Sequence, residues 1–233
     1  MTQVDYRIFH FLFSIFHFPF SDPAMSKILL AATGSVAAIR TPLLYQSLVA
    51  TGHSVKVVAT DAACYFFDAK ELSPGVLIRD ADEWPRERYG RGDPVLHIEL
   101  RRWADLLLIA PLDANTLAKI ATGLADNCLT CVWRAWDPAR PVVLAPAMNT
   151  LMWEHPLTWR HLRQLIADFG GAAPTPTHIS GDALVDWLNA NCRNLYMVPP
   201  IEKELACGDV GIGAMAEVPT IVTAVQSVLA RNR

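Results

Sequence analysis

Residues 27–35 read KILLAATGS, in which a short apolar run ends in a small polar turn. The run does not alternate apolar with polar residues, which is typical of a strand that is buried on both faces. Similar runs follow at SVKVVA (54–59), DLLLIA (105–110) and PVVLA (141–145). Because strands of this kind occur in sheets covered on both sides, these runs predict a parallel sheet.

The segments between these runs have helical periodicity. Residues 36–50 place Val36, Ile39 and Leu43 on one face, so we expect a helix with this face buried and a kink at Pro42. Further helices are expected at 61–68, 115–135, 156–168 and 220–231, and a last strand at 195–198. Strands that alternate with helices predict an α/β fold with a doubly wound parallel sheet.

The composition excludes several classes of protein. Of the 233 residues, 52% are hydrophobic and 18% are charged, and the net charge is −3. A disordered chain would be poorer in apolar residues, and a nucleic-acid-binding protein would carry a basic surplus. The length fits one domain, which we expect over residues 26–233.

The five cysteines are an odd and scattered set, which indicates a reducing compartment and hence a cytoplasmic location. Cys128 and Cys131 form a C-x-x-C pair within an apolar segment. Zinc sites need four matched ligands, and no second pair with such spacing accompanies this one. We therefore expect buried structural cysteines and no metal site.

The first 25 residues differ from the rest of the chain. Residues 8–20 are rich in Phe, but this stretch is shorter than the roughly 20 residues that span a bilayer. Pro19 and Pro23 would break a helix here. We expect a poorly ordered extension, with Met25 as an alternative start and no membrane partner. A weak membrane or partner anchor is the competing interpretation.

Small polar residues follow each predicted strand, at the edge where ligands of such sheets bind. These groups are residues 33–35, 60–61, 111–116 and 146–149. The first has one glycine, Gly34, followed by Ser35, whereas a dinucleotide fold carries three glycines there. This difference favours the single phosphate of a mononucleotide. A plain turn with a helix cap accounts equally well for the same two residues.

Three residues are candidates for chemistry. His97 precedes the strand at 105–110 and has the near-neutral pKa of a general base, although a lone histidine is more often structural. Cys207 lies in a Gly-rich segment and could deliver a proton, or could belong to an ordinary turn. The amide of Asn149 could hold a carboxylate, or could cap the helix that follows.

Four stretches carry a resemblance to a known family. They are GSVAAI (34–39), DPVLHIELRRWADLLLIAPLDANTLAKIATGLADN (93–127), PAMNTLMW (146–153) and LACGDVGIGAMAE (205–217). They resemble the homo-oligomeric flavin-containing cysteine decarboxylases. Within that family the similarity is to the eukaryotic group that acts on phosphopantothenoylcysteine and includes plant halotolerance proteins. The resemblance covers residues 26–169 and 197–230.

The resemblance implies a Rossmann-like, flavodoxin-type subunit that binds FMN and forms a homotrimer with active sites between subunits. The FMN contacts that it implies are Gly34, Ser35, Val36, Thr60, Phe66, Asp113, Ala114, Asn115, Thr116 and Ala147. The substrate contacts that it implies are Asn149, Lys203, Leu205, Ala206 and Met215. His97 takes the role of base, and Cys207 that of proton donor.

The implied reaction converts 4′-phosphopantothenoylcysteine to 4′-phosphopantetheine in coenzyme A biosynthesis. A simple carboxylate loses CO₂ slowly because the resulting carbanion is not delocalised. Oxidation of the substrate thiol to a thioaldehyde supplies the electron acceptor, and the ene-thiol left after CO₂ loss is then reduced. A non-enzymatic phosphatase-regulatory subunit, a flavin prenyltransferase and a nicotinamide oxidoreductase are the alternatives.

The chain departs from the family pattern in three places. Asp113 stands where the family often has Ser. Residues 202–204 read EKE where relatives are basic, so Lys203 alone remains to meet the substrate phosphate by charge. Residues 170–196 have no counterpart in the family pattern. This insertion begins with two glycines, and we expect a surface loop or flap with a short helix at 184–189.

Overall fold

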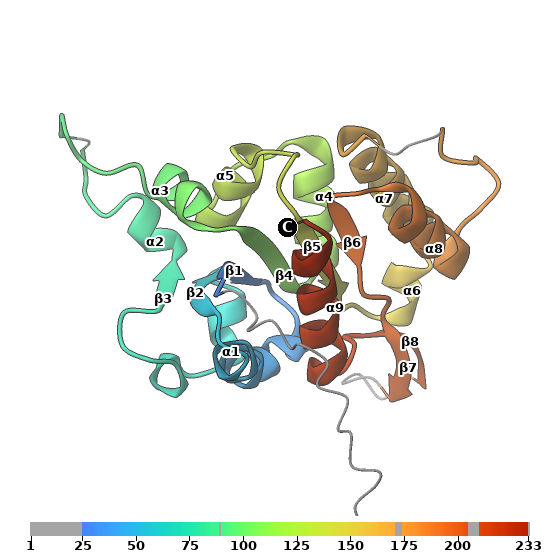
Figure 1. Ribbon diagram of the computed structural model, residues 1–233, viewed down its shortest axis with the longest axis horizontal. Coiled ribbons are helices and arrows are strands. Elements are labelled where there is room, and N and C mark those ends of the chain that lie inside the picture. Colours follow the sequence, from blue (N-terminus) through green and yellow to red (C-terminus); the bar gives the residue numbers. More distant parts are fainter. Residues whose placement is uncertain (1–24, 89, 171–173, 205–209, 233) are drawn as a thin grey trace, which may run out of the picture.

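The computed structural model describes residues 25–88, 90–170, 174–204 and 210–232. The extension expected before Met25 lies outside these residues. A six-stranded parallel sheet forms the centre of the molecule (Figure 1). Its strands are β1 (Lys27–Ala32), β2 (Ser54–Ala59), β3 (Leu77–Arg79), β4 (Leu106–Leu112), β5 (Val142–Pro146) and β6 (Leu195–Met197).

The strand order is β3-β2-β1-β4-β5-β6. The chain therefore builds outward from β1 to β3, then crosses to the other side of β1 and builds outward again through β6. This reversal between β1 and β4 is the topological switch point at which ligands of doubly wound sheets bind. The predicted fold class is confirmed, and each predicted strand is present within two residues of its expected bounds.

Helices cover both faces of the sheet (Figure 1). One face packs against α1 (Thr41–Ala50) and α9 (Val218–Arg231). The other packs against α3 (Leu96–Trp103), α4 (Ala114–Thr122), α5 (Cys128–Arg134), α7 (Pro156–Asp168) and α8 (Gly181–Asn191). Every residue of β4 is buried, as expected for a central strand with helices on both sides.

The prediction of one helix over residues 36–50 is wrong in two respects: the helix is interrupted, and the predicted face is exposed. The chain forms a 3₁₀ helix, η1 (Val36–Arg40), and then α1, with Pro42 in the first turn of α1. Because a 3₁₀ helix has a tighter period than an α-helix, the predicted face does not continue through this junction. Its residues Val36, Ile39 and Leu43 are 50%, 65% and 54% exposed.

Two other helix predictions change in detail. Residues 61–68 contain the single 3₁₀ turn η2 (Ala63–Tyr65) instead of an α-helix. The helical stretch predicted at 115–135 is divided into α4 and α5, and Gly123 ends α4 in the left-handed conformation. Elements that the sequence did not predict include α3 and β3, and also η3 (Ala69–Glu71), α2 (Asp80–Glu83) and α6 (Thr150–Trp153).

The expectation of a surface loop or flap at residues 170–196 is wrong for most of the segment. The short helix expected at 184–189 is present and extends to form α8. Its residues Leu184, Val185 and Leu188 are buried in the core, and β6 follows on the sheet edge. The segment is therefore an integral part of the helical layer.

A separate hairpin of β7 (Ile201–Glu204) and β8 (Val210–Ala214) docks beside the end of β5. The Met148 N–H donates to the Gly213 carbonyl at 2.9 Å. Gly213 has φ +143°, and a side chain there would clash with the Met148 carbonyl oxygen. This close approach explains why glycine occupies the position.

In the described part of the chain, no helix combines the length and the apolar character needed to cross a bilayer.

Candidate active site

The ends of β1 and β4 are tied together by a buried threonine. The Thr33 hydroxyl donates to the Pro111 carbonyl at 2.8 Å and accepts the Asp113 N–H at 2.8 Å. Thr33 is fully buried, so both hydrogen bonds are shielded from water. The loops after β1 and β4 are therefore held together at the switch point, where doubly wound sheets have their ligand-binding crevice.

Gly34 lets a third loop join this crevice. A Cβ atom at Gly34 would lie 2.7 Å from the Ala62 Cβ and 3.3 Å from Asp113 Oδ2. The loops after β1, β2 and β4 consequently meet around a residue without a side chain. Thr60, at the end of β2, is also buried and accepts the Ala63 N–H at 3.2 Å.

Two of the candidate cofactor residues cap helices. Ser35 Oγ accepts the Ala37 N–H at 3.4 Å, and Asp113 Oδ1 accepts the Thr116 N–H at 2.7 Å. A carboxylate at the start of α4 is stabilised by the positive end of that helix. Asp113 therefore performs the same capping function as the Ser that is common in the family, and its charge is held by the helix.

We call the residues around this crevice the cradle, and it contains most of the predicted cofactor contacts. Ala147 joins it from β5, because its N–H donates to the Leu112 carbonyl at 2.9 Å. Val36 and Asn115 are exposed beside it, whereas Thr116 is buried. Phe66 follows the β2 loop and stacks edge-on against Tyr65. The remaining predicted members are Gly34, Ser35, Thr60, Asp113 and Ala114.

The donors of the cradle fit a ligand that carries a phosphate, such as a flavin nucleotide. Gly34 lets the three loops pack together, because a Cβ there would lie 2.7 Å from the Ala62 Cβ. Hydroxyl groups and backbone N–H groups at helix starts suit one phosphate. The nearest carboxylate, Asp113, is hydrogen-bonded to the start of α4.

Asn149 lies at the end of β5, beside the hairpin. Its Oδ1 accepts the Leu151 N–H at 2.9 Å and so caps α6. The alternative prediction, that Asn149 caps the helix that follows it, is therefore confirmed. Capping also fixes the plane of the amide group.

His97 lies in the first turn of α3 and pairs with Glu83 of α2. His97 Nδ1 is 2.5 Å from Glu83 Oε1, and the His97 N–H donates to Glu83 Oε2 at 3.0 Å. Sequence reasoning missed Glu83. The acidic run at 80–83 is the one signal it offers, and an acidic run is usually a solvated surface.

The predicted substrate residues fall in different places. Lys203 is exposed on β7, and its Nζ is 3.5 Å from Glu217. The Arg40 guanidinium, 2.6 Å from Glu217, holds the pKa of that carboxyl below its usual range, with Lys203 adding to the effect. Met215 is buried in the core beside α9. Leu205, Ala206 and Cys207 lie outside the described residues.

The C-x-x-C pair is confirmed as structural for Cys128, which is fully buried at the start of α5. The expectation of a buried cysteine is wrong for Cys131, which is partly exposed and donates to the Ala125 carbonyl at 3.6 Å. Burial raises the pKa of both thiols, and nearby carboxylates raise it further. Both thiols therefore stay protonated near neutral pH.

Comparison with known proteins identifies the class. A family model described as Flavoprotein matches residues 21–230, so the chain belongs to the flavoprotein family, and its cofactor is a flavin. The chain is 47% identical over 213 residues to phosphopantothenoylcysteine decarboxylase of Mus musculus, with 91% of each protein covered. The resemblance drawn from the sequence motifs is confirmed.

Solved structures give the same result. The chain is similar to a mutant PPC decarboxylase complexed with pantothenoylaminoethenethiol, with a TM-score of 0.70 and 45% identity over 87% of this chain and 97% of that one. It is also similar to the FMN binding protein AtHal3, with a TM-score of 0.67 and 46% identity over 87% and 95% of the two chains.

Proposed function

We propose that this protein decarboxylates 4′-phosphopantothenoylcysteine to 4′-phosphopantetheine with FMN as its cofactor, as a step of coenzyme A biosynthesis. The observation that carries the proposal is the cradle at the β1/β4 switch point, where Thr33 and Gly34 hold the loops after β1, β2 and β4 together. Similarity to decarboxylases of this substrate over most of the chain supports it.

FMN is the proposed flavin because the first loop has one glycine and one helix start, which suits a single phosphate. Similarity to an FMN-binding protein of the same fold supports this choice. When bound, the flavin supplies a two-electron acceptor for oxidising the substrate thiol carbon and a hydride donor for the final reduction. Gly34, Ser35 and Asp113 to Thr116 would hold it.

The chain's own residues bind the substrate and move protons. The Asn149 amide, fixed by the α6 cap, donates hydrogen bonds to the substrate carboxylate and orients it. His97 accepts the thiol proton. Cys207 returns a proton to the ene-thiol carbon, and Lys203 meets the phosphate.

We include a homotrimer with shared sites and a cytoplasmic location in the proposal. Val36, Ile39 and Leu43 are three exposed apolar residues in the segment directly after the cradle loop, and a concentration of exposed apolar residues is typical of a subunit interface. Ile39→Asp should convert trimers into monomers in size-exclusion chromatography with light scattering, whereas exposed Gln46→Asp on α1 should not. Wild-type protein that elutes as a monomer would contradict this part.

Activity with purified protein tests the main proposal. The protein should be yellow with about one FMN per chain, and it should release CO₂ from phosphopantothenoylcysteine. A colourless protein that does not bind added FMN would refute the assignment.

Cys207→Ser tests the last step. This variant should release CO₂ but accumulate the oxidised ene-thiol, because the proton donor is lost. The presence of an ene-thiol ligand in a mutant of a relative supports this expectation. Normal phosphopantetheine output from the variant would refute the role of Cys207.

A further inference from the structure

The short helix α2 places a buried carboxylate beside the candidate base. Its sequence, DADE, carries three carboxylates in four residues. The side chain of Glu83 is 4% exposed, whereas Asp82 is exposed to solvent. Burying a carboxylate costs free energy unless hydrogen-bond donors compensate it. The donors that face Glu83 therefore indicate what the residue does.

Both carboxylate oxygens of Glu83 are used by His97. Oε1 is 2.5 Å from the ring nitrogen Nδ1, and Oε2 accepts the backbone N–H at 3.0 Å. An ionised carboxylate has no proton to donate, so the proton in the short contact is on Nδ1. In a neutral imidazole, Nε2 is then the nitrogen with the free electron pair.

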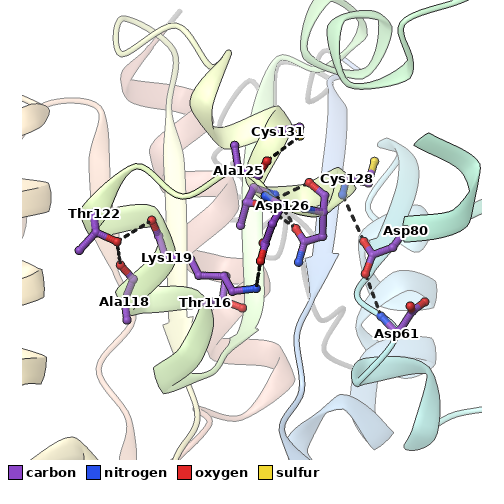
Figure 2. A network of polar contacts seen from close by, with 12 residues as sticks. Asp61, Asp80, Thr116, Ala118, Lys119, Thr122, Ala125, Asp126, Cys128 and Cys131 are labelled. Carbon is purple, nitrogen blue, oxygen red and sulfur yellow. Dashed lines mark hydrogen bonds and ion pairs between the residues drawn. The ribbon is translucent and has the colours of Figure 1, made fainter. Parts of the chain in front are cut away.

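Glu83 is itself held in place by the rest of α2. Figure 2 shows Asp80 accepting the backbone N–H groups of Asp61 and Cys128, at 3.1 and 3.2 Å. The Arg79 N–H donates to Asp82 at 2.7 Å, which closes the first turn. These bonds attach α2 to the β2 loop and to the start of α5. The backbone that carries the Glu83 carboxylate is therefore held in a fixed position.

The other close neighbour of Glu83 is the thiol of Cys128. Burial first, and then the nearby carboxylates, raise the pKa of this thiol, so it stays neutral. The Cys128 thiol therefore brings no charge to this contact, and the His97 ring is the group that donates to Glu83 Oε1. The His97 side chain remains 24% exposed, so the ring is still accessible.

We propose that Glu83 is a positioning residue for His97, which rests on the proposed function of His97 as base. Glu83 fixes the Nδ1–H tautomer and presents Nε2 to the substrate thiol. When the proton moves, the S–H bond breaks, the Nε2–H bond forms and sulfur keeps the electron pair. Glu83 then stabilises the imidazolium and receives no proton itself.

Glu83→Gln is the decisive variant, and Glu99→Gln is the matched control, because Glu99 is an exposed glutamate on α3. Gln keeps the size of the side chain, but its amide can donate to Nδ1 as well as accept from it. We expect kcat to fall about 10- to 100-fold with little change in KM, whereas the control should stay within about twofold. Bound flavin and melting temperature should be unchanged in both.

The tautomer gives a second readout that a merely structural role would not change. In ¹⁵N spectra of histidine rings, His97 is assigned from the signal lost in His97→Asn. Wild-type protein should show the Nδ1–H form, and Glu83→Gln should show a mixture with the Nε2–H form. Glu83→Asp keeps the charge one methylene further away and should be intermediate in both kcat and tautomer.

Full kcat in Glu83→Gln, or a His97 ring that remains entirely in the Nδ1–H form, would overturn the inference. If Glu83→Gln does not fold, the same two measurements on Glu83→Asp decide. For Glu83→Asp, an intermediate kcat and a mixture of the two His97 tautomers support the inference, and wild-type values of both overturn it. Undiminished turnover in His97→Asn would instead refute the role of His97 as the base. This variant therefore distinguishes a failure of the proposed function from a failure of the inference about Glu83.

Discussion

The cradle and the α2–α3 contact are built by different means. In the cradle, small residues let three loops meet, and Thr33 joins two of them through one hydroxyl. In the α2–α3 contact, a buried carboxylate and an imidazole pair across two helices. Binding of the cofactor therefore depends on close packing of three loops around a residue without a side chain, whereas the candidate catalytic group depends on one charge. A single added methyl group should damage the first region, and a neutralised charge should damage the second without unfolding.

Gly34→Ala should have the largest effect, because it tests directly how closely the three loops of the cradle pack at Gly34. The new Cβ would lie 2.7 Å from the Ala62 Cβ, so one of the two loops must move. Overpacking costs roughly 1–3 kcal/mol, so flavin affinity should fall about tenfold or more. Titration of the flavin-free protein with FMN measures this change.

The control for that variant is a second substitution. Gly34→Ala combined with Ala62→Gly removes the opposing methyl group and should restore most of the flavin affinity. Failure of the double variant to recover would mean that the cradle is not limited by this contact.

Thr33→Val should destabilise the cradle without adding volume. It removes the hydroxyl that joins Pro111 to Asp113 and leaves the buried Asp113 N–H without its acceptor. We expect the free energy of unfolding to fall by about 2 kcal/mol, measured by chemical denaturation. Thr33→Ser keeps the hydroxyl and should lose much less. Equal losses in the two variants would contradict the role of the hydrogen bonds.

Asp80→Asn tests the anchor of the α2–α3 contact through its pH dependence. Burial raises the pKa of the Asp80 carboxyl. The folded state thus binds this proton more tightly than the unfolded chain, so the stability is greatest in acid and falls as the pH rises through the raised pKa. The Asn variant does not titrate, and its single amide oxygen can accept from only one of Asp61 and Cys128, a loss that does not change with pH.

The unfolding free energy of Asp80→Asn relative to wild type should therefore increase as the pH rises above about 4. The change should be smaller than the Thr33 effect, because Asp80 is half-buried. Exposed Asp82→Asn is the control and should show no such increase. A relative stability that stays level with pH would show that burial of Asp80 carries no penalty.

The smallest effect is expected at the contact between α4, which begins in the cradle, and the loop before α5, which packs near α2. Lys119 of α4 and Asp126, in the loop before α5, form an ion pair at 2.8 Å (Figure 2). Asp126 is 57% exposed, so Lys119→Gln should cost about 0.5 kcal/mol or less, and high salt should reduce the difference. Loss of flavin binding in this variant would show that the two regions are more tightly coupled than their geometry indicates.

The central features of the fold and of the cradle were predictable from the sequence. Apolar runs that do not alternate identify the buried strands, and the carboxyl ends of parallel strands meet at one edge. The polar residues after β1, β2 and β4 therefore had to come together around Gly34. Helix α7 also has its predicted bounds, because Pro156 marks its start.

Other features depend on tertiary contacts that no local pattern contains. Helical spacing placed Ile39 and Leu43 on a buried face, but the 3₁₀ turn at 36–40 rotates that face outward. Glu83 and His97 are 14 residues apart in the chain and meet because α2 and α3 pack together. In the insertion, glycines and prolines suggested a loop and outweighed the helical spacing of Leu184 and Leu188.

Both outer strands of the sheet, β3 and β6, are only three residues long. Each rim consequently exposes a very short row of unpaired backbone groups, which is a poor template for recruiting a strand from another molecule. Self-association of this protein through the edges of its six-stranded sheet is thereby disfavoured. We expect copies of the chain to contact one another through helical surfaces instead.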